Sequence, residues 1–238
     1  MRELRWKSKE MSKTEINECA YCGVSGITSQ EHVIPECLFE QPLPNNMITV
    51  RACADCNTLK SKDDDYLRDY LVTNLSIYKQ KIPQRLFAGK MARSMQRNSS
   101  SFAKEVNISK IVDTPFFSNG ERLSAVYFDL RRLQDILEKI VKGLFYYAKA
   151  KRIADETKIK VSNFNYNQEE IEKIELMVKQ ETHILHRVGD GTTFYFLTAF
   201  FESEGELASY WMLVFYEKFC IEAKTSLLAE NSKDKSYQ

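Results

Sequence analysis

The chain of 238 residues is poor in several residue types, and each scarcity excludes a class of protein. Its eight glycines and five prolines are too few for a collagen-like or low-complexity sequence. No run of about 18 apolar residues occurs, so we expect no membrane-spanning helix. The 34 basic side chains almost balance 33 acidic ones, and the net charge of +1 excludes a uniformly basic nucleic-acid coat and an acidic disordered tail.

The N-terminus also lacks the features of a secretory signal. Residues 1–13 (MRELRWKSKEMSK) carry charges with no apolar stretch behind them. We therefore expect a cytoplasmic protein, whose reducing surroundings disfavour a disulfide framework.

Four of the six cysteines form two C-x-x-C pairs, Cys19 with Cys22 and Cys53 with Cys56. Two such pairs in one short segment of a cytoplasmic protein are typical of a tetrahedral zinc site, which would clamp the ends of the intervening loop. Gly23, directly after the second cysteine, suits the tight turn of a zinc knuckle. A redox dithiol or a coincidental spacing is the alternative. We predict a structural Zn²⁺ held by these four thiolates.

The pattern of apolar residues predicts an α+β fold, with a small zinc-stapled module followed by an α+β domain that has a mostly antiparallel sheet. The expected divisions are a polar N-terminal segment (1–18), the zinc-stapled module with its following helix (19–80), a basic linker or helix (81–105) and the α+β domain (106–238). The expected strands are 106–112, 123–130, 158–164, 182–188, 192–200 and 207–216, and the expected helices are 63–80, 131–151 and 167–180.

Local signals refine these boundaries. The carboxylates of Asp63–Asp65 suit the positive end of a helix dipole, so the first helix is expected to begin there and Pro83 to interrupt it. Gly143 in the middle of a predicted helix indicates close packing against a neighbour. The segment Gly189–Gly191 supplies a turn between two strands. Residues 89–105, with a cluster of serine and asparagine, are predicted to form a loop.

Residues 79–110 hold eight basic side chains and a single acidic one, Glu105. A phosphate backbone responds to such a local field even when the overall charge is close to zero. The segment is therefore a candidate nucleic-acid contact. A solvated helix with a linker is the alternative interpretation.

The zinc-clamped loop contains two elements with catalytic residue types, Glu31-His32-Val33-Ile34-Pro35 and Cys53-Ala54-Asp55-Cys56-Asn57. The first is a [DE]-H-[IV]-x-P element and the second is a C-x-x-C-[NH] element. Through these two elements, residues 19–72 resemble the HNH endonuclease superfamily. The resemblance is to the branch whose ββα-metal hairpin is held by a four-cysteine zinc. The stretch LPNNMITVRACADCN followed by KSKDDDYLRDYL is similar to a bacterial and phage-borne HNH subgroup.

The resemblance implies a centre that hydrolyses phosphodiester bonds. His32, the only histidine in the first 182 residues, would be the general base, a role that suits an imidazole with an ordinary pKa of about 6.5. Glu31, on the opposite side of the strand, and Asn57, at the helix start, would bind a catalytic Mg²⁺ or Mn²⁺, since these ions prefer hard oxygen ligands. Asn46 would orient the His32 ring, with Asn45 or a backbone carbonyl as alternatives.

The implied function is a metal-dependent endonuclease that acts on nucleic acid, in the first place double-stranded DNA, by one-metal hydrolysis. Small HNH proteins of this style resemble effectors of defence systems or mobile elements that are paired with an ATPase or sensor protein. The C-terminal half would then serve docking, dimerisation or substrate positioning. The alternative is a non-catalytic zinc ribbon that binds nucleic acid or protein.

Other polar residues have less specific interpretations. Asp63–Asp65 are expected to stabilise the helix start, with assistance to the catalytic metal as the alternative. Arg51 and Lys60 either contact phosphate or are solvated. Cys37 is expected to be a buried apolar residue. His183, His186 and Trp211 are assigned to the surface or the core rather than to a ligand site.

Overall fold

The computed structural model describes residues 16–74, 77, 80–93, 107–112, 123–164, 184–203 and 206–226. Within these ranges the chain is α+β with a mostly antiparallel five-stranded sheet, as the hydrophobic pattern predicted. None of the helices in these ranges combines the length and the apolar character that crossing a membrane requires.

The N-terminal part folds as a small antiparallel sheet followed by a long helix. β1 (Ile16–Glu18) pairs with β2 (Ser25–His32), which pairs with β3 (Thr49–Cys53). A single turn of 3₁₀ helix, η1 (Glu36–Leu38), follows β2, and α1 (Ala54–Thr73) begins directly after β3. Because the pairing sets Cys53 opposite Thr28, the first turn of α1 lies against β2.

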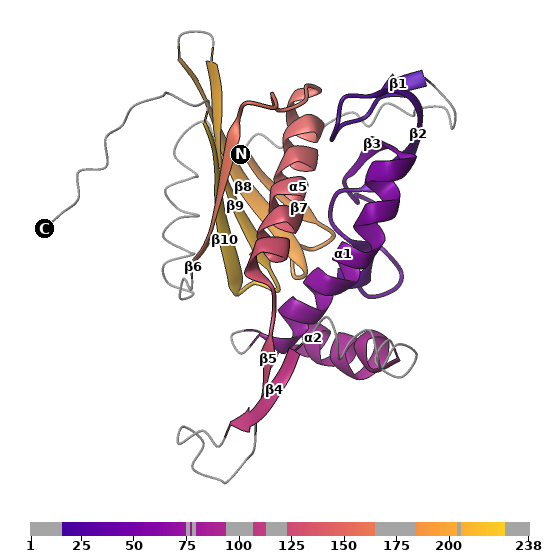
Figure 1. The fold of residues 1–238 in the computed structure, drawn as a ribbon, viewed down its shortest axis with the longest axis vertical. Coiled ribbons are helices and arrows are strands. Elements are labelled where there is room, and N and C mark those ends of the chain that lie inside the picture. Colours follow the sequence, from indigo (N-terminus) through magenta and orange to yellow (C-terminus); the bar gives the residue numbers. More distant parts are fainter. Residues whose placement is uncertain are drawn as a thin grey trace, which may run out of the picture.

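A short helical segment and a hairpin connect this part to the rest of the chain. α2 (Lys81–Leu86) continues into a π-helical turn, η2 (Phe87–Met91). β4 (Asn107–Val112) and β5 (Leu123–Tyr127) then form an antiparallel hairpin. In Figure 1, α2 lies at the lower end of α1 and the β4–β5 hairpin projects away from both.

The long helix α5 (Leu130–Lys149) confirms the helix predicted at 131–151. The carboxylate of Asp129 caps its first turn by accepting hydrogen bonds from the backbone amides of Arg131 and Arg132. The apolar stripe that predicted this helix is buried along its length: Leu133, Ile136, Leu137, Ile140, Val141, Leu144 and Phe145.

The C-terminal sheet has the strand order β6-β10-β9-β8-β7, and every neighbouring pair is antiparallel. Its strands are β6 (Lys158–Phe164), β7 (Ile184–Val188), β8 (Phe194–Ser203), β9 (Glu206–Phe215) and β10 (Phe219–Ser226). The predicted strands are confirmed, whereas β10 was not foreseen. Trp211 is fully buried in this sheet, so its assignment to the core is also confirmed.

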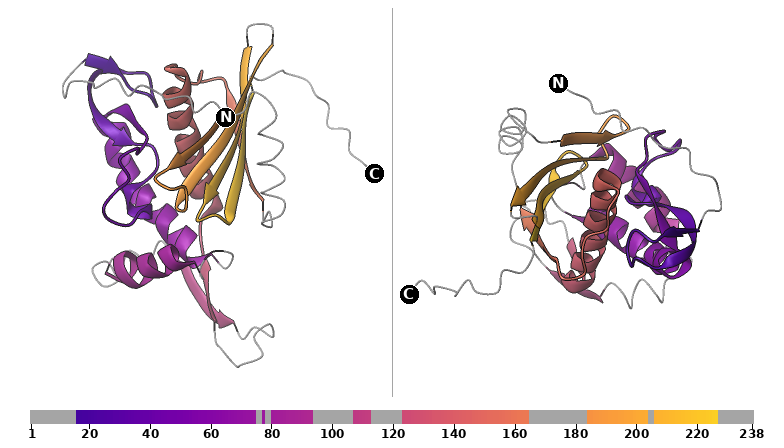
Figure 2. Two further views of the ribbon diagram at one scale, coloured as in Figure 1. Left: turned by 180° about the vertical axis from the view of Figure 1, so that it is seen from behind. Right: turned by 90° about the horizontal axis from the view of Figure 1, so that it is seen from above.

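The helix α5 lies between the C-terminal sheet and the N-terminal part, and this layering is visible in Figures 1 and 2. One cluster of buried side chains extends through all three layers. Gly143 of α5 permits the contact, since a Cβ at this position would lie 2.8 Å from Val33 Cγ1 and 3.1 Å from the Tyr21 hydroxyl. The Tyr216 hydroxyl, near the end of β9, donates a hydrogen bond to the Leu38 carbonyl at 3.0 Å. The C-terminal sheet therefore braces the loop that follows β2.

Two predicted boundaries are wrong. The helix predicted at 63–80 begins at Ala54 and ends at Thr73, so Asp63–Asp65 lie inside it rather than at its positive end. The acidic run Asp63–Asp65 was misleading because the helix start is set by the turn at the second cysteine pair. The acidic residue in the first helical turn is Asp55. Pro83 does not interrupt this helix but lies in the first turn of α2, where its fixed φ is tolerated.

The loop predicted at 89–105 begins with helical residues as far as Arg93. The remainder of that loop from residue 94, the helix predicted at 167–180 and the side chain of His183 lie outside the described residues.

Candidate metal centre and catalytic groove

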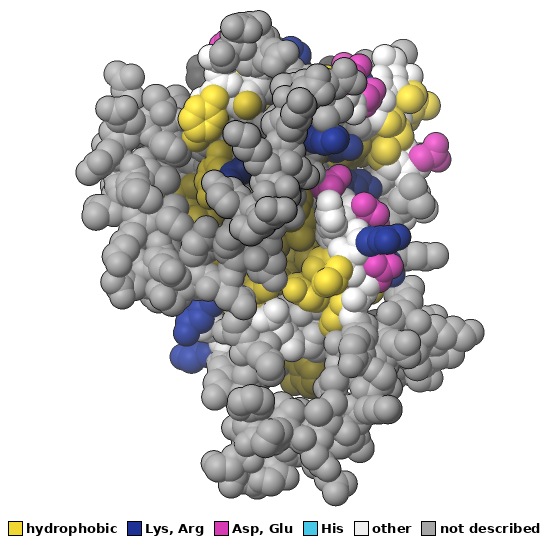
Figure 3. Space-filling view, turned by 60° about the vertical axis from the view of Figure 1, so that its left-hand side comes forward, with side chains coloured by type: hydrophobic (Ala, Val, Ile, Leu, Met, Phe, Trp, Pro, Cys, Tyr) yellow, Lys and Arg dark blue, Asp and Glu magenta, His cyan; other side chains and the backbone are white. Residues whose placement is uncertain are grey.

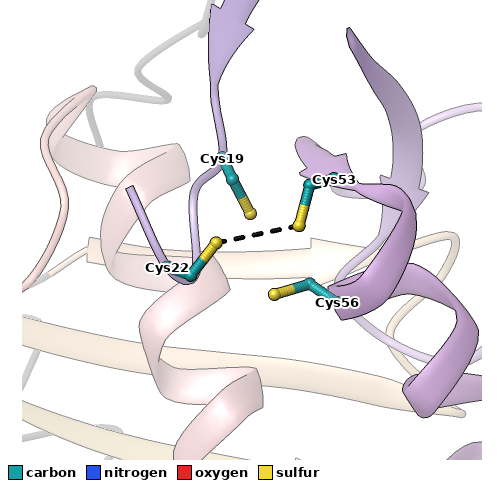
Figure 4. A group of neighbouring side chains, drawn as sticks. All are labelled: Cys19, Cys22, Cys53 and Cys56. Carbon is teal, nitrogen blue, oxygen red and sulfur yellow. Dashed lines mark hydrogen bonds between the residues drawn. The ribbon is translucent and has the colours of Figure 1, made fainter. Parts of the chain in front are cut away.

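The four cysteines of the two C-x-x-C pairs converge (Figure 4). Cys19 and Cys22 lie in the turn between β1 and β2, whereas Cys53 ends β3 and Cys56 lies in the first turn of α1. Their Sγ atoms lie within 4.8 Å of one another, and those of Cys22 and Cys53 are 3.7 Å apart. Tetrahedral zinc with Zn–S bonds of about 2.3 Å requires sulfur separations of about 3.8 Å. The cluster therefore fits a metal ion such as zinc.

A tight backbone turn presents the first cysteine pair. Gly23 has a φ of +75°, a conformation that glycine adopts without strain, and its N–H donates to the Cys19 carbonyl at 2.9 Å. The Ala20 N–H donates to the Arg51 carbonyl of β3 at 2.9 Å, which ties the turn to the strand that carries the second pair. The knuckle predicted from Gly23 is thus present.

The surroundings of the thiols also suit a metal. Burial alone would raise the pKa of Cys19, but hydrogen bonds at the backbone of Cys22, Cys53 and Tyr21 lower it to about 7. Burial raises the pKa of Cys56, and ligation to a cation is what deprotonates such a thiol. The arrangement favours a structural metal over a free dithiol pair.

A groove of about 490 Å³ lies beside this cluster, and Glu31, His32 and Asn57 all line it. These are three of the four residues that the sequence singled out for catalysis and cation binding; the fourth is Asn46. The other residues that line the groove are Glu36, Cys37, Gln41, Asp64, Asp65 and Lys90. The groove thus joins the end of β2, the loop after it, α1 and η2.

Asn57 is in direct contact with β2. Its Nδ2 donates a hydrogen bond to Ser29 Oγ at 2.9 Å, a bond that does not use the amide oxygen. Ser29 and Glu31 are two residues apart in β2 and therefore share one face of the strand. The Glu31 carboxylate and the Asn57 amide oxygen are hard donors of the kind that Mg²⁺ and Mn²⁺ prefer. The two donors expected for the catalytic cation are therefore brought to the same wall.

The ring of His32 has a carboxylate partner. Its Nδ1 lies 2.6 Å from Glu36 Oε1, and the His32 side chain is 33% exposed. Glu36 reaches the ring because η1 begins at this residue, immediately after Pro35. An Nδ1–H that donates to a carboxylate fixes the tautomer in which Nε2 carries the lone pair. This tautomer can accept a proton at Nε2.

The orienting role expected for Asn46 is corrected by its contacts. Its Nδ2 donates to the Arg187 carbonyl at 2.8 Å, and its Oδ1 accepts from the Gly189 N–H at 2.7 Å. The two amide atoms thus bond the end of β7 and the turn that follows it, far along the chain, and Asn46 is not among the residues that line the groove. Glu36 contacts the His32 ring instead.

The three consecutive aspartates have separate roles. Asp63 pairs with Arg132 of α5 at 3.0 Å, and Asp65 pairs with the buried Arg68 at 2.5 Å. Asp64 lies seven residues after Asn57 in α1, so the two share a helical face, and both line the groove. Two roles were considered for these aspartates, stabilisation of a helix start and assistance to a catalytic metal. The position of Asp64 fits the second role better than the first.

The remaining polar residues have the following positions. Arg51 is 7% exposed and therefore not solvated. Only the backbone of Lys60 is described. The Cys37 Sγ donates to the Asp64 carbonyl at 3.3 Å, and burial raises the pKa of this thiol to about 12. His186 stacks on Phe196 in the sheet, as expected for a core histidine.

Several groove residues escaped the sequence analysis, namely Glu36, Gln41 and Lys90. Glu36 had a usable signal, since it stands four residues after His32 and follows a proline that can start a helical turn. Lys90 was counted in the basic segment but not assigned to the groove, because only the path of the chain after α1 brings η2 beside β2.

Comparisons with known proteins identify no relative. No model of a protein family matches the chain, and neither the curated proteins nor the solved structures contain a match.

Proposed function

We propose that this chain is a metal-dependent endonuclease of the HNH type that hydrolyses phosphodiester bonds of nucleic acid. The substrate that we propose is double-stranded DNA. One observation carries the proposal: Glu31, His32 and Asn57 line a single groove next to a four-cysteine cluster that fits zinc. A cysteine cluster alone would support only a scaffold. The groove adds an imidazole and oxygen donors, which a scaffold does not need.

The cysteine cluster has a structural role in this proposal. The cysteines tie β1, β2, β3 and the start of α1 together. All four ligand positions of a tetrahedral ion would be filled by protein, which leaves no open position for a substrate. The reactive cation is then a second ion, held by oxygen donors.

Glu31 and Asn57 are the residues that would hold the reactive cation, with Asp64 on the same wall. When bound, a divalent cation supplies positive charge opposite the scissile phosphate and the leaving 3′ oxygen. Glu31 binds through a carboxylate oxygen. Asn57 is held in position by the bond from its Nδ2 to Ser29, which does not use its amide oxygen.

His32 acts as the general base of the proposed reaction. With Nδ1–H donating to Glu36, the Nε2 atom accepts a proton from a water molecule, and the resulting hydroxide attacks phosphorus in line with the leaving 3′ oxygen. Glu36 touches neither substrate nor cation in this scheme. It holds the ring and stabilises the imidazolium that forms, and is therefore a positioning residue.

A cleavage assay tests the proposal. Supercoiled plasmid and single-stranded DNA and RNA are incubated with the full chain in Mg²⁺ or Mn²⁺, beside His32→Ala and a matched variant, His186→Phe, that removes a histidine from the core. We expect cleavage by the wild type and by His186→Phe, and a loss of about 10²–10⁴-fold for His32→Ala. A cleavage activity of His32→Ala equal to that of the wild type would contradict the proposal and favour the non-catalytic zinc module.

A further inference from the structure

A second groove continues from the candidate catalytic groove. It has a volume of about 270 Å³ and is lined by Glu40, Gln41, Arg85, Leu86, Gly89, Lys90 and Arg93. Gln41 and Lys90 line both grooves, so the two grooves are adjacent, and we call them together the channel. We call this second part the basic groove. It lies between the segment of α2 and η2 and residues 40–41 of the zinc-clamped loop.

The two ends of the channel carry opposite charge. Four carboxylates line the catalytic groove: Glu31, Glu36, Asp64 and Asp65. Three cations, Arg85, Lys90 and Arg93, line the basic groove against one carboxylate, Glu40, which pairs with Arg85 at 3.2 Å. On the described part of the face drawn in Figure 3, basic and acidic side chains are interspersed. In the channel, by contrast, the carboxylates gather in one groove and the cations in the other.

The two remaining cations of the basic groove differ in how they are held. The Lys90 Nζ donates to the Phe39 carbonyl at 2.9 Å and to the Cys37 carbonyl at 3.4 Å, neutral partners that fix the ammonium without cancelling its charge. Arg93 is exposed and, within the part of the chain that the structure describes, makes no hydrogen bond or ion pair. A rigid lysine followed by an available guanidinium is an arrangement that suits an anion.

Gly89 lines the basic groove together with these two cations. It lies in the π-helical turn η2, an irregularity frequent at functional sites. A Cβ at this position would lie 3.8 Å from Arg93 Nη1 and 3.9 Å from Nη2. A larger side chain at residue 89 would therefore occupy the space in front of the guanidinium.

We propose that the basic groove is a phosphate subsite, in which Lys90 and Arg93 bind the backbone of the nucleic-acid strand one or more phosphates away from the scissile bond. The identity of the ligand rests on the proposed nuclease function. A strand carries one negative charge per about 3.4 Å of helix axis, so a strand whose scissile phosphate lies at the cation presents further phosphates along the channel. Binding at the subsite would orient the cleaved strand.

Binding measurements without turnover test the subsite. In a buffer that contains neither Mg²⁺ nor Mn²⁺, the affinity of the zinc-loaded full chain for a short labelled duplex and for its single strand is measured by fluorescence anisotropy between about 50 and 200 mM salt. The variants are Arg93→Gln, which removes the guanidinium, and Gly89→Glu, which places a carboxylate beside it. Lys160→Gln is the matched control, since it removes an exposed cation from β6. Thermal melting verifies that each variant is folded.

We expect Arg93→Gln and Gly89→Glu to weaken binding about tenfold and Arg93→Gln to reduce the slope of log affinity against log salt by about 0.7–0.9, with Lys160→Gln close to wild type. Equal affinities for Arg93→Gln and Lys160→Gln would overturn the subsite. A chain that cleaves DNA with unchanged affinity in both groove variants would refute the subsite but not the nuclease. A chain that binds through Arg93 and cleaves nothing in any metal would retain the subsite and refute the nuclease. A comparison of the affinities for the duplex and for the single strand shows which of the two the groove binds.

Discussion

His32 and Glu36 form a hydrogen-bonded pair, with His32 Nδ1 at 2.6 Å from Glu36 Oε1. The pair is local in sequence, since the partners are four positions apart, and it exists because β2 ends at His32 and η1 begins at Glu36. The carboxylate sets which nitrogen of the ring can accept a proton. Glu36 thereby becomes part of the proposed catalytic machinery although it does not touch the substrate.

The first prediction concerns this pair. Glu36→Gln keeps a hydrogen-bond acceptor near Nδ1 but removes the negative charge that stabilises the imidazolium. We expect kcat to fall about 10–100-fold while KM and the affinity for DNA without Mg²⁺ or Mn²⁺ stay unchanged. Steady-state kinetics and anisotropy measure the two quantities separately. A parallel fall in DNA affinity would show that Glu36 acts on binding and would exclude the positioning role.

The second prediction concerns the cysteine cluster. Elemental analysis of the wild type should find one zinc per chain, and Cys56→Ser should lose it together with much of the thermal stability, since the metal joins two strands and a helix start. Cys220→Ser is the matched control, because Cys220 is a cysteine of β10 that lies outside the cluster. An equal zinc content in both variants would contradict the assignment of the cluster as the zinc site.

The third prediction concerns the contact between α5 and the loop after β2. A Cβ at Gly143 would lie 2.8 Å from Val33, so Gly143→Ala overpacks this contact, which costs about 1–3 kcal/mol and exceeds the gain in helix propensity of about 1 kcal/mol. In a Val33→Ala background the same substitution should be tolerated better, with a coupling energy on the order of 1 kcal/mol. Urea denaturation of the four proteins measures the cycle, and strict additivity would argue against the contact.

The fourth prediction concerns His186. Burial against Phe196 and Tyr147 lowers its pKa below the ordinary value of 6.5. Because the unfolded chain then takes up the proton at a higher pH than the folded chain does, the stability contributed by the neutral ring is complete above pH 6.5 and is lost as the pH falls through this range. His186→Phe should therefore lose less thermal stability than the wild type between pH 7 and 5. Identical pH dependence of the two melting midpoints would refute this role.

Much of the fold was predictable because its signals are local. The stripe of α5 and the aromatic strands around Trp211 each bury their own apolar pattern, so periodicity alone placed them. The start of α1 was missed because the acidic run at Asp63–Asp65 carries a helix-start signal that a stronger local feature, the turn at Cys53, overrides.

The candidate site was predictable only in part. Glu31, His32 and Asn57 stand in short motifs, and the cysteine clamp brings those motifs together. Asn46 was assigned by spacing, but spacing does not report the end of β7 and the turn that follows it, which lie more than 140 residues away in the chain and engage both of its amide atoms. The sequence shows that Lys90 and Arg93 are basic, but it does not predict that they line a groove with Gln41. Their position there depends on how α2 packs against the loop after β2.

The central claim of this account is that one divalent cation binds between Glu31 and Asn57, facing His32. Electron paramagnetic resonance of Mn²⁺ titrated into the zinc-loaded chain measures it directly. We predict one Mn²⁺ site per chain in the wild type, loss of the site in Glu31→Gln and weakening in Asn57→Ala with the zinc content unchanged, and a retained site without cleavage activity in His32→Ala. No Mn²⁺ binding to the wild type, or undiminished binding to Glu31→Gln, would contradict the claim.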